Sequence, residues 1–195
     1  HGDPSVRVPT TGLWHPEEYQ AWRMHDNLKE LQADPRIWGH FVWAMFDFAA
    51  DRRTEGGCLG LNDKGLVAYD HKTKKDAFYL YQANWTTNAV LHLVGSRAAT
   101  VTNAVTTVMG FSNVGEVTLA VNGRNLGVRK PSAACGVVWR DVPLAIGSNV
   151  VELTAAGIVR KTVWNCTAPL AFTVVPDRPN HLYHVGEEAC FSVTA

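Results

Sequence analysis

The character of this chain changes at Trp85, and that change constrains the fold more than any other feature. Before Trp85, apolar segments of helix or strand length alternate with a long glycine-containing loop. After it come short runs of β-branched residues with turn residues about every 8–12 positions, which is typical of a β-sandwich. One uniform fold does not produce both patterns. We therefore expect an α/β part followed by an all-β part.

A helix is predicted near the N-terminus, after a loop over residues 1–15. Pro16 suits the first helical position, and Glu17 and Glu18 suit the positive end of the helix dipole. Apolar residues then recur at helical spacing. The helix ends before Pro35, because the residue that precedes a proline avoids the helical conformation.

A strand is predicted over residues 37–45, which are nearly all apolar or aromatic, and Trp38 is expected to pack in the core. A strand that is covered on both faces, as in a parallel barrel, shows this lack of alternation. A loop follows over residues 49–65, and a helix over about 74–83. The order helix, strand, long loop, helix predicts the closing segment of a β/α architecture.

Seven strands are predicted after Trp85 and indicate a sandwich of the immunoglobulin type. Asn122–Gly123 lies between two of them and predicts a type I′ hairpin turn. Trp139 and Trp164 fall within strand patterns and are expected in the core. The predicted strands lie near 90–94, 101–111, 116–121, 125–129, 136–142, 149–154 and 158–164.

Three units follow from these patterns: residues 1–85, residues 86–165 and residues 166–195. The last is expected to be the incomplete start of a further β-domain, with a strand near 172–175, a Pro-Asp-Arg-Pro turn and a strand over 189–194. The chain begins at His1 without a methionine, so we expect it to be a fragment of a longer protein.

Composition excludes several classes of function. The 18 basic and 18 acidic residues cancel, so neither nucleic acid nor a membrane surface is expected as a partner. No apolar run approaches the roughly 20 residues that span a bilayer. No metal or cofactor is expected, since no paired-cysteine motif or glycine-rich phosphate loop occurs. Most of the four cysteines are expected to be free and buried, although a Cys135–Cys166 or Cys166–Cys190 disulfide stays open.

Several phrases in the first 85 residues resemble glycoside hydrolase family two, and most closely its bacterial β-galactosidase-like branch. They are TTG and HPEEYQ between Thr10 and Gln20, FVWAMFDFA from Phe41, NDKGLV from Asn62, KKDAFY from Lys74 and ANW from Ala83. The resemblance implies that residues 1–85 form the C-terminal part of a (β/α)8 catalytic barrel. An immunoglobulin-like β-sandwich would follow over residues 86–165.

The same resemblance implies a retaining glycosidase that cleaves terminal β-galactosides. Such enzymes use two glutamates, one acid/base and one nucleophile, about 5–5.5 Å apart. In the family both lie on earlier strands, so we expect them upstream of His1 and expect no catalytic residue in this chain. Glu17 and Glu18 are assigned to the helix start instead. The expected partners are a carbohydrate substrate and the upstream barrel half of the same parent chain, without which the fragment is expected to be inactive.

Trp43 and Asp47 are the first two candidates for binding the sugar. Trp43 lies near the carboxyl end of the predicted 37–45 strand, where barrel enzymes build their sites, and its indole can pack on a sugar ring. A core position is commoner for a tryptophan, but the resemblance reverses that preference. Asp47 can accept a sugar hydroxyl, or it can hold the loop through Arg52 or Arg53. The sequence leaves these two roles open.

Asn62 and Lys64 complete the candidates. An amide and an ammonium two residues apart can converge on hydroxyls or on a carboxylate. In relatives that cleave uronides a similar pair binds the sugar carboxylate, so β-uronide hydrolysis is an alternative function. An exposed polar turn without a binding role is another alternative. A third alternative, from another class, is a non-catalytic β-sandwich associated with carbohydrate.

Overall fold

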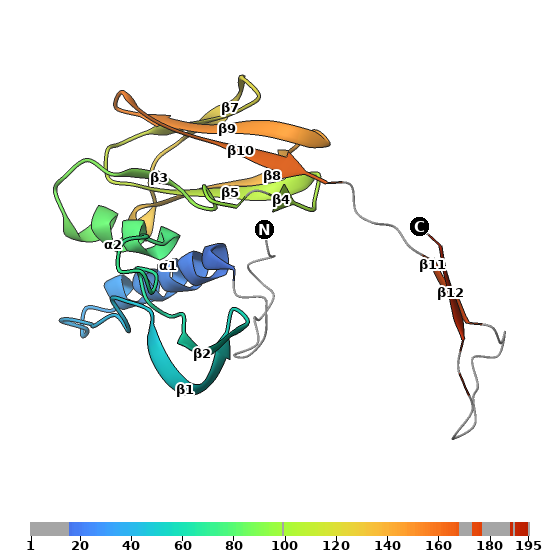
Figure 1. Cartoon of the computed structure of the whole chain (residues 1–195). Coiled ribbons are helices and arrows are strands. Elements are labelled where there is room, and N and C mark those ends of the chain that lie inside the picture. The colour runs from blue at the N-terminus through green and yellow to red at the C-terminus, as the bar shows by residue number, and fades with distance from the viewer. Residues whose placement is uncertain (1–15, 99, 168–172, 177–187, 189, 195) are drawn as a thin grey trace.

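The computed structural model describes residues 16–98, 100–167, 173–176, 188 and 190–194. Two helices, α1 (Glu17–Ala33) and α2 (Asp76–Trp85), lie side by side under a β-sandwich, and a hairpin extends from their other side (Figure 1). The predicted loop over residues 1–15 lies outside the described residues.

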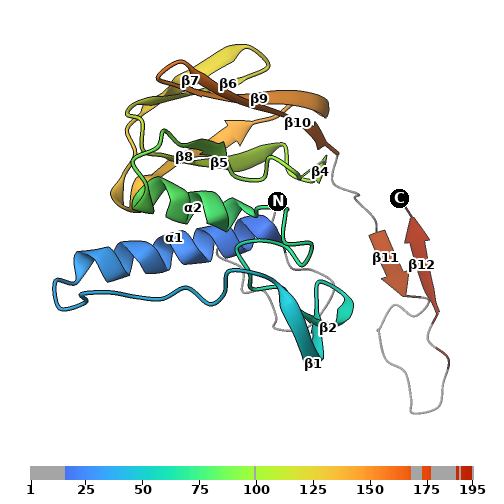
Figure 2. The ribbon, with the colours of Figure 1, turned by 60° about the vertical axis from the view of Figure 1, so that its left-hand side comes forward.

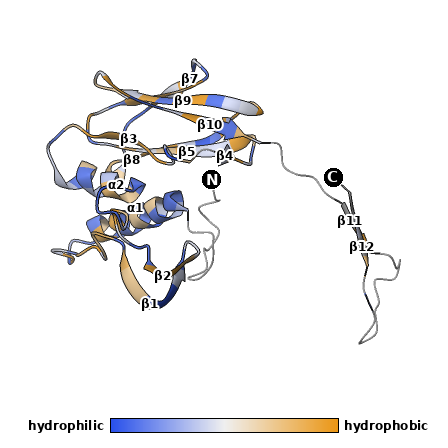
Figure 3. Cartoon of the chain, in the orientation of Figure 1, coloured by the Kyte–Doolittle hydropathy of each residue, from blue (hydrophilic) through white to orange (hydrophobic). Residues whose placement is uncertain are grey.

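Both predicted helices are confirmed. Helix α1 begins directly after Pro16 and ends before Asp34, and its buried residues, Ala21, His25 and Leu28, lie at helical spacing. Helix α2 begins and ends two residues later than predicted. Neither helix is long and apolar enough to cross a bilayer, and both carry polar as well as apolar residues along their length (Figure 3).

The predicted strand over residues 37–45 is wrong. This segment is irregular, and a single parallel bridge, between Phe46 and Val67, directly follows it. Trp38 is 95% exposed and Phe41 is 98% exposed, so the predicted core position of Trp38 is also wrong. A strand needs a neighbour for its backbone hydrogen bonds, and in the described part of the chain this segment bonds to Asp34 at its start and to residues 64–67 near its end. A barrel is therefore not evident among the described residues.

The predicted loop over residues 49–65 is instead largely a hairpin of strands β1 (Phe48–Glu55) and β2 (Cys58–Asn62). Gly56 and Gly57 join the strands with φ of 60° and 78°, as a type I′ turn requires. The charged residues of β1 hide the strand pattern, because most of this hairpin is exposed and does not alternate apolar with polar residues.

The predicted β-sandwich is confirmed, with a five-stranded sheet in the order β4-β10-β9-β6-β7 and a three-stranded sheet in the order β3-β5-β8 (Figures 1 and 2). Among the described strands of these two sheets, β4 and β10 pair in parallel and the other neighbours pair antiparallel. Asn122 and Gly123 have φ of 51° and 79°, which confirms the type I′ hairpin. The strands are β3 (Leu91–Leu93), β4 (Thr100–Val101), β5 (Val105–Ser112), β6 (Val117–Val121), β7 (Arg124–Arg129), β8 (Gly136–Pro143), β9 (Gly147–Ala155) and β10 (Ile158–Cys166).

The three-stranded sheet is covered on both faces. On one face, a core shared with the five-stranded sheet contains Trp139 and Trp164, which confirms their predicted burial. On the other, Met109 and Phe111 pack with the helices in a second core, to which the 3₁₀ turn η1 (Ala133–Cys135) also contributes. This arrangement fixes the helices, and everything attached to them, against the sandwich (Figure 2).

Strands β11 (Thr173–Pro176) and β12 (Phe191–Thr194) form an antiparallel hairpin close to the two strands predicted in residues 166–195. Most of the predicted Pro-Asp-Arg-Pro turn lies outside the described residues. All four cysteines are free, so neither proposed disulfide exists. The expectation of burial holds for Cys166, but Cys58 and Cys190 are exposed.

Candidate functional site

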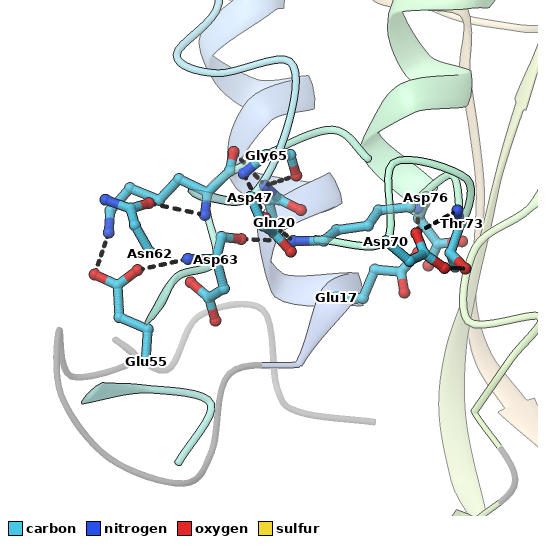
Figure 4. A network of polar contacts seen from close by, with 12 residues as sticks. Glu17, Gln20, Asp47, Glu55, Asn62, Asp63, Gly65, Asp70, Thr73 and Asp76 are labelled. Carbon is cyan, nitrogen blue, oxygen red and sulfur yellow. Dashed lines mark hydrogen bonds and ion pairs between the residues drawn. The ribbon is translucent and has the colours of Figure 1, made fainter. Parts of the chain in front are cut away.

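The turn after β2, residues 62–65, is fastened to helix α1 (Figure 4). Within the turn, the Lys64 amide donates to Asn62 Oδ1 at 3.1 Å, so the Asn62 side chain shapes the turn from the inside. Gln20 Nε2 of α1 donates to the carbonyls of Lys64, at 3.0 Å, and Gly65, at 3.1 Å. Asn62 is buried and its neighbours are held by the helix, so this is not a loose surface loop.

Trp43 lies beside this turn. The amide of the next residue, Ala44, donates to the Lys64 carbonyl at 3.4 Å. The indole is 70% exposed and meets the ring of Phe48 edge-on, with 5.9 Å between centroids. Phe48 is paired with Asn62 across the β1–β2 hairpin. The structure thus brings Trp43, Asn62 and Lys64 into one neighbourhood, and it leaves the indole open to solvent rather than in a core.

Asp47 has a structural role. It is buried, and its Oδ1 accepts hydrogen bonds from the Gly65 amide at 2.9 Å and from Lys75 Nζ at 2.7 Å. Lys75 Nζ also donates to the Asp63 carbonyl at 2.6 Å. The loop is therefore held through Lys75 and not, as one predicted role had it, through Arg52 or Arg53. Little of the Asp47 carboxylate is left exposed to accept a sugar hydroxyl, the other role predicted for it.

Gly65 allows the turn to approach this segment closely. A Cβ at this position would lie 2.1 Å from the Asp47 amide nitrogen and 2.2 Å from the carbonyl carbon of Phe46. Both are backbone atoms, which cannot rotate away. Only glycine fits here, and the backbone hydrogen bonds that join residues 44–47 to residues 64–67 depend on it.

Glu55 is a residue of this region that sequence reasoning missed. Its fully buried carboxylate accepts hydrogen bonds from the Lys64 ammonium, from Arg53 Nη1 at 2.9 Å and from the Asp63 amide at 2.9 Å. Burial alone would raise the pKa of Glu55, but the hydrogen bonds from Lys64 and Asp63 outweigh it and lower the pKa to about 2. Reading residues 48–55 as a strand would have placed Arg53 and Glu55 on one side of it.

Lys64 is only partly buried, because 42% of its side chain is exposed. Its ammonium is anchored by Glu55, while part of the side chain stays accessible. The arrangement therefore offers an open indole and a partly exposed lysine, whose ammonium is held by Glu55, on neighbouring segments. Such a pair can pack against a sugar ring and donate hydrogen bonds to its oxygens.

A second polar cluster joins the helices to the sandwich. Asp76, at the start of α2, accepts from His92 Nε2 at 2.6 Å and from the Gly95 amide at 2.8 Å. Glu17 accepts from the Asp76 amide and pairs with Arg97. Burial, then the Asp76 charge, raises the pKa of Glu17 against the lowering effect of these hydrogen bonds. Glu17 thus links α1 to α2, beyond the helix-start role predicted for it.

Among the residues that the structure describes, no group of three or more His, Cys, Asp or Glu side chains is placed to hold a metal ion.

Comparisons with known proteins place this geometry in context. Residues 103–164 match a family described as "Domain of unknown function (DUF4982)". A β-glucuronidase from Bacteroides fragilis is 41% identical over 159 residues, which are 80% of this chain and 23% of that protein. The chain thus spans about a quarter of the length of that relative.

Two solved structures are similar in both sequence and fold. An FMN-binding β-glucuronidase from Facaelibacterium prausnitzii L2-6 is 38% identical with a TM-score of 0.70, over 77% of this chain and 23% of that one. A putative β-galactosidase from Bacteroides fragilis is 30% identical with a TM-score of 0.77, over 87% of this chain and 26% of that one.

Proposed function

This chain belongs to glycoside hydrolase family two, and we propose that it forms the sugar-binding side of a retaining β-glycosidase. The observation that carries the proposal is the placement of an exposed Trp43 beside a rigid turn that presents Lys64. The indole packs on the sugar ring, and Lys64 donates to its oxygens. The catalytic glutamates belong to the upstream part of the parent chain, so the fragment alone is inactive.

The proposed architecture is the end of a (β/α)8 barrel over residues 1–85, an immunoglobulin-like sandwich over 86–165 and the start of a further β-domain over 166–195. The parallel bridge between Phe46 and Val67 supports the first assignment, since parallel pairing is the pairing of a barrel. Exposed Trp38 and Phe41 support it too, because such large apolar side chains need a cover. The cover proposed is the upstream barrel half of the same parent chain.

Two substrate classes remain in competition, β-galactosides and β-uronides. The sequence favoured galactosides. The accessible Lys64 ammonium favours a uronide, because a sugar carboxylate is the partner that gains most from a fixed positive charge. The β-glucuronidase relatives at 41% and 38% identity point the same way. We place the uronide first and the galactoside second.

The test uses the full-length parent enzyme with an aryl β-glucuronide and an aryl β-galactoside. We expect hydrolysis of at least one, and expect Trp43→Ala to lower kcat/KM for both, because the indole packs on a ring that the two sugars share. Lys64→Met should raise KM for the glucuronide far more than for the galactoside. Lys130→Met removes another exposed, paired lysine on the sandwich side and serves as the control. Failure to hydrolyse either substrate would favour the non-catalytic sandwich instead.

A further inference from the structure

The Glu55 carboxylate serves two cations at once. Its Oε1 accepts from both the Lys64 ammonium and Arg53 Nη1, while Oε2 accepts the Asp63 amide. The carboxylate is fully buried, whereas each cation keeps more than two fifths of its side-chain surface exposed. The long Lys64 side chain is therefore held at its charged end by a buried carboxylate, while part of its surface stays accessible.

Holding the ammonium in this way matters for binding. A free lysine side chain loses rotamer entropy when it grips a ligand, but one already fixed by a carboxylate has lost most of that freedom beforehand. An ammonium has three N–H donors and Glu55 takes one of them. The others can serve a ligand at the exposed side.

We propose that Glu55 is a positioning residue, which holds the Lys64 ammonium in the orientation that meets the substrate. The proposal rests on the proposed function, in which Lys64 contacts the sugar. Because Glu55 is buried, it influences the substrate through the groups that it holds, and among these Lys64 is the one proposed to contact the sugar. The hydrogen bond to the Asp63 amide fixes the carboxylate in turn, because it ties Glu55 to the backbone of the same turn.

A double-mutant cycle in the full-length enzyme tests this role. KM and kcat are measured for Glu55→Gln, Lys64→Met and the double variant with the better of the two aryl glycosides. Glutamine keeps the shape of Glu55 but removes its charge and one of its two acceptor oxygens. We expect each single variant to raise KM roughly tenfold with little change in kcat, since both lose a charge-assisted hydrogen bond. In the Lys64→Met background, Glu55→Gln should add less than about twofold.

The outcomes separate the inference from the function on which it rests. If Lys64→Met raises KM but Glu55→Gln does not, or if the two effects multiply, Glu55 does not act through Lys64 and the inference is overturned while the function stands. If Lys64→Met has no effect, the proposed contact between Lys64 and the sugar is wrong, and the role of Glu55 falls with it. If the parent hydrolyses neither glycoside, the proposed function itself is refuted, and with it this role.

Two further variants guard against a purely structural effect. Glu152→Gln removes another lysine-paired glutamate, on β9 of the sandwich, and should leave KM unchanged. Circular dichroism at the assay temperature establishes that each variant is folded. Glu55→Asp keeps the carboxylate on a shorter side chain and should raise KM less than Glu55→Gln does. A larger increase for Glu55→Asp contradicts a role for the charge.

Discussion

Replacement of Gly65 by alanine should open the contact between residues 44–47 and residues 64–67. The added Cβ would lie 2.1 Å from the Asp47 amide nitrogen, whereas ordinary contacts begin at 3.4 Å, so the two backbones must separate by about 1.3 Å. Overpacking of this kind costs roughly 1–3 kcal/mol. The hydrogen bonds from the amides of Asp47, Leu66 and Val67 across this contact are stretched as well, and each loses a fraction of the roughly 1 kcal/mol that such a bond contributes.

Together these effects suggest a local cost of about 3 kcal/mol, which corresponds to roughly a hundredfold change in the opening equilibrium. Hydrogen exchange measured by mass spectrometry should show peptides that contain residues 44–47 and 65–67 exchanging about a hundredfold faster, while sandwich peptides stay protected. Gly39→Ala is the matched control, because a Cβ there meets nothing within 4 Å. Protection that stays within about threefold of the parent in Gly65→Ala would refute the close-approach argument.

Four other variants test the packing and the charges, each by unfolding with urea. Burial, then the Lys29 charge, lowers the pKa of His25, so the unfolded chain binds a proton before the folded chain does. Stability should therefore fall as pH drops below about 6.5, and His25→Gln should weaken that dependence. Glu55 has its pKa lowered to about 2, so its stabilising contribution should be lost as pH falls from about 4.5 towards 2, and Glu55→Gln should remove this loss. Asp76→Asn replaces a carboxylate that accepts a hydrogen bond from the buried Gly95 amide by an amide that can place its own N–H groups there. The free energy of unfolding should fall by about 2 kcal/mol at pH 7, and an unchanged value would contradict a stabilising role for this hydrogen bond. Trp164→Phe removes the indole hydrogen bond to the Gly95 carbonyl at 2.9 Å and should cost about 1–2 kcal/mol, whereas an unchanged midpoint would contradict that bond's role.

The sandwich was predictable because its signals are local. Alternating burial along strands such as β6 and β9 is present in the sequence itself, and the Asn122–Gly123 turn requires two positive φ angles that these residues tolerate. The start and end of α1 were likewise fixed by Pro16 and Pro35, which act on their immediate neighbours.

The errors arose where structure depends on distant partners. Residues 37–45 have a strand's composition, but a strand forms only where neighbours accept its hydrogen bonds, and the described part of the chain supplies few. Asp47 was expected to bind a sugar hydroxyl or a neighbouring arginine of its own loop, yet its partner Lys75 lies 28 residues away in the sequence. Lys64 and Trp43 were identified by type and position, while Glu55 was missed because a single carboxylate among charged residues carries no periodic signal.

The doubly covered three-stranded sheet has a consequence for dividing this protein. A truncated chain that begins at residue 86 would keep every sandwich strand, but Met109 and Phe111 would become exposed, since α1 and α2 cover them. The sequence boundary at Trp85 is thus not a boundary between two independent cores. Anyone who exchanges this sandwich between related enzymes should move the two helices with it.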